Sequence, residues 1–115
     1  STITVTNIKA TGETASRAAT GVAASYAQVD GDPVGLNASF NVASATDVAT
    51  GRFDIAFTNN MSAATYAVPA ETDVQAMRIE AGLITASGFR VTTEVTSGTD
   101  TDATYAMFAT FGDLA

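Results

Sequence analysis

The stretch ASFNVASATDVATGRFDIAFTNNMSAATYAV, which runs from Ala38 to Val68, indicates the fold class more clearly than any other part of the chain. Its large apolar side chains recur at every second residue, first at Phe40 and Val42 and then at Phe53, Ile55 and Phe57. Side chains on a β-strand point alternately to opposite faces, so this spacing places all five on one side of a hairpin. Thr50 and Gly51 lie in the connection, where they favour a turn. The stretch therefore predicts a half-buried antiparallel sheet.

Much of the remaining chain has the pattern of short strands. Alternating or β-branched segments predict strands over residues 1–8, 22–29, 66–68, 88–95 and 103–111. Residues 9–21 have no such alternation and predict a loop, which would leave residues 1–8 as an N-terminal strand or arm. Seven or eight short strands separated by turn residues predict one all-β domain over residues 1–115, an antiparallel β-sandwich or barrel.

Residues 74–83, VQAMRIEAGL, fit two patterns. Met77 and Ile79 lie on one face of a strand, whereas Val74, Met77 and Ala81 fit one stripe of a helix. We favour a strand because the segments on both sides are β.

Charge and composition exclude several classes of function. The net charge is −7, and the four arginines are scattered at positions 17, 52, 78 and 90, whereas nucleic-acid binding needs clustered basic residues. We therefore expect no nucleic-acid partner. The apolar runs are far shorter than the roughly 20 residues that span a bilayer, so we expect no membrane insertion. The chain contains no histidine and no cysteine, which excludes Ser-His and Cys-His nucleophiles. We expect a protein that is not an enzyme and holds no cofactor.

Two acidic pairs are the remaining candidates for a metal site. Asp30 and Asp32 offer carboxylate oxygens to a calcium ion, which takes roughly six to eight oxygen ligands. Asp100 and Asp102 have the same spacing. Asp-Gly and Thr-Asp sequences also make good turns, and we favour this second interpretation for both pairs.

The composition predicts an assembly. Charged residues make up 15% of the chain, against about 25% in typical domains, while hydrophobic residues make up 46% and mean hydropathy is +0.18. Small uncharged side chains pack well against another chain, although threonine and acidic charge also suffice to keep a monomer in solution. We expect a homo-oligomer. The predicted interface residues are Thr2, Ile3, Val5, Arg17, Phe111 and Leu114.

The aromatic residues have two interpretations. Tyr26, Tyr66 and Tyr105 are candidates for stacking on a sugar, but we favour tyrosines buried at strand ends with the hydroxyl bonded to the backbone. The predicted core phenylalanines are Phe40, Phe53, Phe57, Phe89 and Phe108. We expect Phe111 to pack either under the sheet or across a subunit boundary.

Three segments resemble a module of tail-fibre and appendage proteins of tailed bacteriophages. They are NIKATGETASRAATGVAASYAQVDGD (Asn7–Asp32), the central run from Ser39 to Val68, and SGFRVTTEVTSGTDTDATYAMFATFGDL (Ser87–Leu114). The chain departs from that module at Tyr26 and Val29, where the module has a tryptophan and an aromatic residue, and over residues 71–83. The resemblance implies a non-enzymatic, β-rich module on the virion surface that is usually trimeric.

Three functions follow as expectations. The favoured one is a capsid decoration (cement) or head-fibre protein that stabilises the shell, because the length holds one module and no fibre shaft. The alternative is a tail-fibre receptor-binding module that reads a host surface glycan through the loops at residues 30–35 and 97–102. A weaker alternative is a carbohydrate-binding module.

Overall fold

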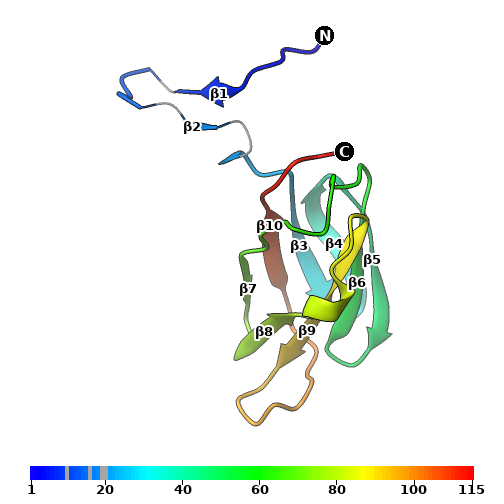
Figure 1. The fold of residues 1–115 in the computed structure, drawn as a ribbon. Helices are drawn as coiled ribbons and strands as arrows, with labels where there is room; N and C mark the ends of the chain where they lie inside the picture. Colours follow the sequence, from blue (N-terminus) through cyan, green and yellow to red (C-terminus); the bar gives the residue numbers. More distant parts are fainter. Residues whose placement is uncertain (10, 16, 19–20) are drawn as a thin grey trace.

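Two antiparallel sheets packed face to face form the body of the protein (Figure 1). The computed structural model describes residues 1–9, 11–15, 17–18 and 21–115, and of residues 17 and 18 it describes the backbone. No α-helix occurs among these residues. This arrangement confirms the predicted all-β sandwich.

Each sheet has four strands. The first has the order β4-β3-β10-β7 and contains β3 (Ser25–Gly31), β4 (Val34–Phe40), β7 (Ala70–Thr72) and β10 (Ala106–Thr110). The second has the order β5-β6-β9-β8 and contains β5 (Val42–Ala49), β6 (Arg52–Phe57), β8 (Ala76–Ile79) and β9 (Gly88–Glu94). The chain crosses between the sheets from β4 to β5 and from β7 to β8. Both lateral edges of the sandwich are thereby joined by covalent connections.

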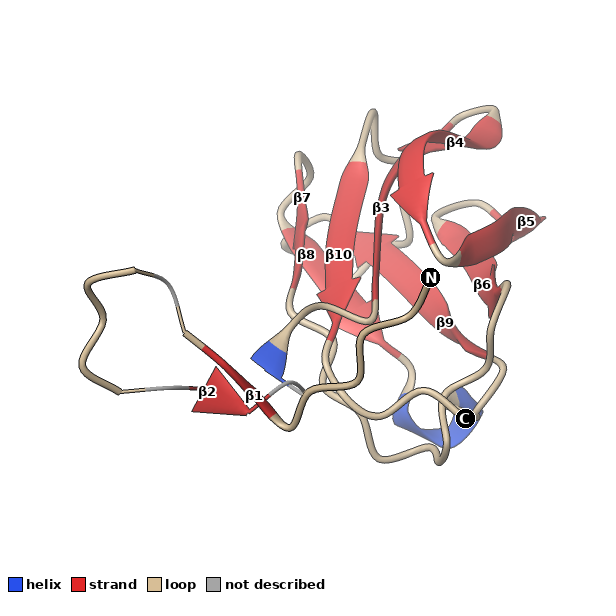
Figure 2. Cartoon of the chain, turned by 90° about the horizontal axis from the view of Figure 1, so that it is seen from above, coloured by secondary structure: helices blue, strands red, loops and turns tan. Residues whose placement is uncertain are grey.

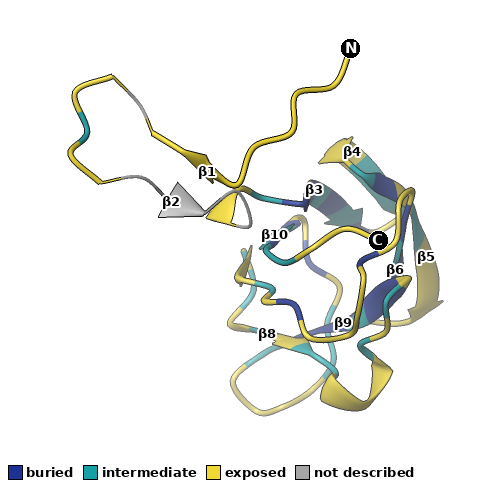
Figure 3. Cartoon of the chain, turned by 45° about the horizontal axis from the view of Figure 1, so that its top comes forward, coloured by how far each residue is buried: buried dark blue, intermediate teal, exposed yellow. Residues whose placement is uncertain are grey.

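The core lies between the inner faces of the two sheets (Figure 3). Phe53, Ile55 and Phe57 on β6 are all buried, as their spacing predicted. Phe89 of β9 meets Phe108 of β10 edge to face across the sandwich, with ring centroids 4.9 Å apart. Burial of one such large apolar side chain contributes roughly 1.5–3 kcal/mol, so this contact between the layers is a main source of stability.

Phe40 corrects the predicted core. The expectation placed Phe40 and Val42 on one face, but Asn41 between them has φ 56°, in the left-handed region. Strand β4 therefore ends at Phe40 and β5 begins at Val42 in the other sheet. Val42 is buried, whereas Phe40 is 53% exposed on the outside. Asn41 also donates to the carbonyls of Ala24 and Asn59, both at 3.1 Å, which fixes this corner.

The N-terminal segment is an arm and not a strand of the sandwich (Figure 2). Of residues 1–8, only β1 (Asn7–Ile8) pairs, and its partner β2 (Arg17–Ala18) lies inside the segment predicted as a loop. We call residues 1–21 the arm. The radius of gyration, 15.5 Å, exceeds the value of about 13 Å expected for a compact chain of this length. Residues 2–6 alternate threonine with isoleucine or valine and have strand propensity, but no strand among the described residues pairs with them.

Three other boundaries differ from the predictions. Residues 66–68 do not form a regular strand, because only Ala67 pairs, with Phe111, and β7 begins after Pro69. The predicted turn at residues 30–35 is shorter, since β3 continues to Gly31 and β4 begins at Val34. The ambiguous segment contains β8 at residues 76–79, as favoured, followed by a 3₁₀ turn at Ala81–Leu83.

Tyr66 is the one tyrosine that fits the predicted role. Its ring is buried, and its hydroxyl donates to the carbonyls of Thr85 and Gly88 at 2.8 and 2.9 Å. Gly88 leaves no room for a β-carbon, which would collide with the carbonyl of Ile55 on the paired strand. Tyr26 and Tyr105 are instead exposed, because they lie on the outward side of the first sheet and in the loop before β10.

Replacing Ile55 by aspartate is expected to prevent folding. Ile55 is 3% exposed, and burial of an unpaired carboxylate there costs more than about 4 kcal/mol, a large part of the roughly 5–15 kcal/mol that stabilises a domain. Circular dichroism and a proton NMR spectrum of the variant should show an unfolded chain. The control is Ala56→Asp, the next residue along β6, whose side chain faces outward. A folded Ile55→Asp protein would contradict the assignment of the core.

Tyr66→Phe is expected to lower stability by about 1 kcal/mol at pH 8, because the hydroxyl bonds are lost. Burial raises the pKa of Tyr66 from 10.0 to about 12. The stability that this shift provides is complete below pH 10 and is lost as the pH rises towards 12, since only the unfolded chain ionises easily in that window. Urea unfolding at several pH values should show a steeper alkaline loss in the wild type than in Tyr66→Phe. The exposed Tyr105→Phe is the control.

Candidate functional site

The two sheets present very different outer faces to solvent. On the second sheet, side chains of β6, β8 and β9 form the ion pairs Arg78–Glu94 (2.8 Å) and Arg90–Asp54 (2.7 Å), and Arg52 of β6 pairs with Asp100 in the loop before β10 (2.8 Å). We call the corresponding surface of the first sheet the neutral face. It comprises Tyr26, Gln28, Ala38, Phe40, Met107 and Ala109. Two acidic residues, Asp30 and Glu71, lie at its margins.

Strand register places the neutral residues in two rows across the sheet. Ala109, Tyr26 and Phe40 are directly opposite one another on β10, β3 and β4. Met107, Gln28 and Ala38 form the adjacent row. Residues directly opposite on antiparallel strands point to the same side, so the six side chains share one surface.

Tyr26 and Phe40 form a stacked pair that is open to solvent. Their ring centroids lie 6.0 Å apart with an angle of 28° between the planes, and each side chain is about half exposed. Gln28 accepts from the amide of Asn37 at 3.3 Å and donates to the sulfur of Met107 at 3.7 Å. This half of the neutral face combines two half-exposed aromatic rings with two amide groups.

A shallow apolar groove of about 450 Å³ continues the neutral face towards β7. It is lined by Pro69, Ala70, Glu71, Met107, Phe108, Ala109 and Phe111. The amide of Ala109 donates to the carbonyl of Pro69 at 3.1 Å, which holds β7 beside β10 along the groove. Glu71 supplies its only charged side chain.

The predicted interface residues fall in separate places. Thr2, Ile3 and Val5 lie on the exposed arm, and Phe111 lines the groove. Leu114 pairs with Met61 and is half exposed. The backbone of Arg17 pairs with Ile8 in the arm, and its side chain lies outside the described part of the structure. The predicted interface did not include Tyr26, Phe40 or Met107. The sequence does contain one signal that Phe40 points outward. Asn41 follows it, and asparagine is enriched in the left-handed backbone region, where a strand can end and the chain can change sheets.

The calcium candidates occupy a turn. The carboxylate of Asp30 accepts from the amide of Asp32 at 3.0 Å, which is the bond of an Asx turn. Asp32, Asp47 and Asp102 line a hollow of about 310 Å³ at this end of the sandwich. Asp102 accepts from the amide of Gly51 at 2.7 Å. Within the residues described, no three acidic side chains are placed to hold a metal ion.

The loop at residues 97–102 is fastened to β9 and to the start of β6. Asp100 pairs with Arg52, and the amide of Thr101 donates to the carbonyl of Thr93 at 2.9 Å. The hydroxyl of Thr93 donates to the carbonyl of Thr101 at 2.6 Å. A loop held in this way is a fixed part of the surface.

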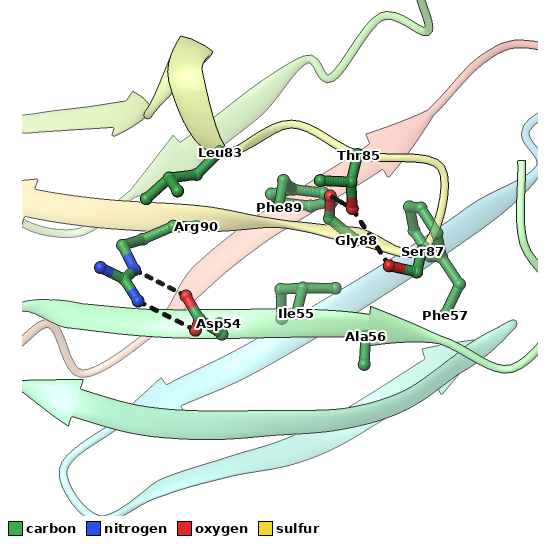
Figure 4. Close-up of a pocket in the computed structure, with 10 residues that line it drawn as sticks. All are labelled: Asp54, Ile55, Ala56, Phe57, Leu83, Thr85, Ser87, Gly88, Phe89 and Arg90. Carbon is green, nitrogen blue, oxygen red and sulfur yellow. Dashed lines mark hydrogen bonds and ion pairs between the residues drawn. The ribbon is translucent and has the colours of Figure 1, made fainter. Parts of the chain in front are cut away.

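The other hollow lies on the charged face (Figure 4) and has a volume of about 270 Å³. Arg90 holds both oxygens of Asp54, at 2.7 and 3.1 Å, and this bond raises the pKa of Arg90. The hydroxyls of Thr85 and Ser87 lie 3.1 Å apart beside it. The carboxylate is engaged by the arginine and stands apart from the hydroxyls, so the arrangement is that of a cross-strand ion pair.

The fold and its surface define a β-sandwich with one neutral outer face, one charged outer face and an extended arm. No protein-family model, curated protein or solved structure matches the chain. The resemblance to phage appendage modules therefore stays a prediction from the sequence. The described part of the chain contains no helix long and apolar enough to cross a membrane.

The aromatic pair is expected to contribute little to folding. Phe40→Ala should change the free energy of unfolding by about 1 kcal/mol or less, because the side chain is already half in water. The matched Phe53→Ala should cost about 3–5 kcal/mol, since Phe53 is 2% exposed. Urea unfolding of the two variants tests this difference. Equal costs would show that Phe40 packs in a core and is not available to a partner.

Proposed function

We propose that this protein is a non-enzymatic structural component of a bacteriophage virion, most consistent with a capsid decoration or head-fibre protein that binds the shell through protein contacts. The observation that carries this proposal is the contrast between the two outer faces. A domain that stays monomeric in water is favoured by charged side chains on both faces, yet one face leaves Tyr26 and Phe40 about half exposed and Met107 partly exposed. Uncharged aromatic and methionine side chains are enriched where proteins meet.

The stabilising action would follow from mass action. A protein that binds the assembled shell and not its separated subunits shifts the equilibrium towards the shell, in proportion to its occupancy. No reactive group is needed for this role. A homo-oligomer, with a trimer favoured, would present several neutral faces at once and gain affinity through multivalency.

A second function is favoured by one specific observation. Tyr26 and Phe40 are half-exposed aromatic side chains of the kind that stack on a neutral sugar ring, and the amides of Gln28 and Asn37 lie beside them. In this alternative the protein is a receptor-binding module that recognises a host surface glycan. The neutral face, and not the fastened loop at residues 97–102, would then be the recognition surface.

Immunogold electron microscopy of phage particles whose genome encodes this chain tests both functions. Labelling spread over the capsid is the result expected for decoration, and labelling confined to the tail would favour receptor binding. Adding the purified chain to shells stripped of it should raise their resistance to heat, whereas Phe40→Ala combined with Tyr26→Ala should restore less. The charged-face variant Ala56→Glu is the control. Particles without any label would overturn the proposal.

A further inference from the structure

We infer that the arm of one copy binds in the apolar groove of a second copy, with Ile3 and Val5 placed against Ala109 and Phe111. This inference rests on the proposed function in assuming that copies of the chain associate. The arm and the groove both belong to this chain, so an arm that does not bind its own groove meets the same groove on a second copy. Figure 1 shows the N-terminal residues separate from the strands of their own sandwich, above the end at which the C-terminus lies.

The arm contains apolar side chains that its own chain leaves in water. Ile3 is 87% exposed and Val5 is 47% exposed, and both alternate with threonines. This alternation gives an extended segment one apolar side and one hydroxyl side. Burial of the isoleucine and the valine against a partner is therefore favourable, and the threonines would remain in water.

The groove offers a matching apolar surface. Ala109 and Phe111 are two residues apart on and just after β10, and Ile3 and Val5 are two residues apart in the arm. Residues separated by two in extended chains lie about 7 Å apart on the same side, so the two pairs have the same spacing. Pro69 and Met107 complete the apolar lining on either side.

Charge also favours the contact. Residues 1–21 contain two basic residues, Lys9 and Arg17, and one acidic residue. Residues 22–115 contain three basic and eleven acidic residues, and the three arginines there are each paired with a carboxylate. Residues 1–21 thus have a net positive charge and residues 22–115 a net negative charge, and Glu71 lies in the lining of the groove. Attraction between a basic arm and an acidic body promotes their encounter.

Disulfide trapping tests the inference directly, because the chain has no cysteine of its own. A Val5→Cys chain and an Ala109→Cys chain carry tags of different length, so that a mixed dimer can be told from the two symmetric ones. The two chains are mixed under mild oxidation, and disulfide formation is followed on a non-reducing gel. The expected result is a mixed disulfide that forms at least about tenfold faster than those of two matched controls, as for sites brought together by binding. The controls pair Thr4→Cys with Ala109→Cys, and Val5→Cys with Ala56→Cys.

Two results would overturn the inference. One is an equal rate of mixed disulfide with the control cysteines. The other is a disulfide inside a single chain that carries both Val5→Cys and Ala109→Cys when the mixture gives none, which would mean that each arm folds onto its own groove. The experiment uses the purified chain, so trapping without any labelling of phage particles would overturn the proposed function and leave the arm contact standing.

Sedimentation velocity provides a second measurement. Replacing both Ile3 and Val5 by aspartate should weaken self-association roughly tenfold for each apolar side chain lost. Thr4→Asp with Thr6→Asp adds the same charge on the opposite side of the arm and should have little effect. An equal loss of self-association in both double variants would show that the added negative charge alone weakens the contact. It would overturn the placement of Ile3 and Val5 in the groove.

Discussion

The edge-to-face contact of Phe89 with Phe108 joins the two sheets, and the positions of the other elements depend on it. The contact requires the inner faces of β9 and β10 to lie opposite each other, although these strands belong to different sheets. Phe57 and Tyr66 extend the cluster with centroids 5.6 Å apart. Once these rings are buried, every strand in the sandwich has a defined inner side, and the outward residues are determined as well.

The alternating pattern at residues 53–57 predicted β6 and its buried side. When one face of a sheet is buried, apolar residues at every second position of a strand must point to that face. Residues 88–95 were predicted for the same reason. Phe40 was predicted wrongly because the left-handed backbone of Asn41 moves the chain to the other sheet, which spacing alone does not reveal. The N-terminal strand was predicted from propensity, but a strand also needs a neighbour, and β1 finds only β2.

The candidate surface was less predictable than the core. Composition indicated a protein poor in charge, but the uneven distribution of charge between two faces depends on which strands are neighbours. Arg90 pairs with Asp54 across β9 and β6, whereas Met107 faces Gln28 across β10 and β3. The acidic excess and the neutral face therefore coexist in one small domain, because cross-strand pairing gathers the charges on the other sheet. Isolated ion pairs of this kind add little stability. Their main effect is that the outer face of the first sheet carries few charges.

Gly88 has an evolutionary consequence. At this position one strand approaches the next so closely that the obstacle to a side chain is the backbone of Ile55 itself. Repacking of neighbouring side chains does not relieve such a collision. A second substitution elsewhere is therefore not expected to restore folding after Gly88 is replaced. Lineages that diversify the exterior are expected to retain this glycine, which would make it a reliable anchor for aligning distant relatives whose surfaces no longer resemble one another.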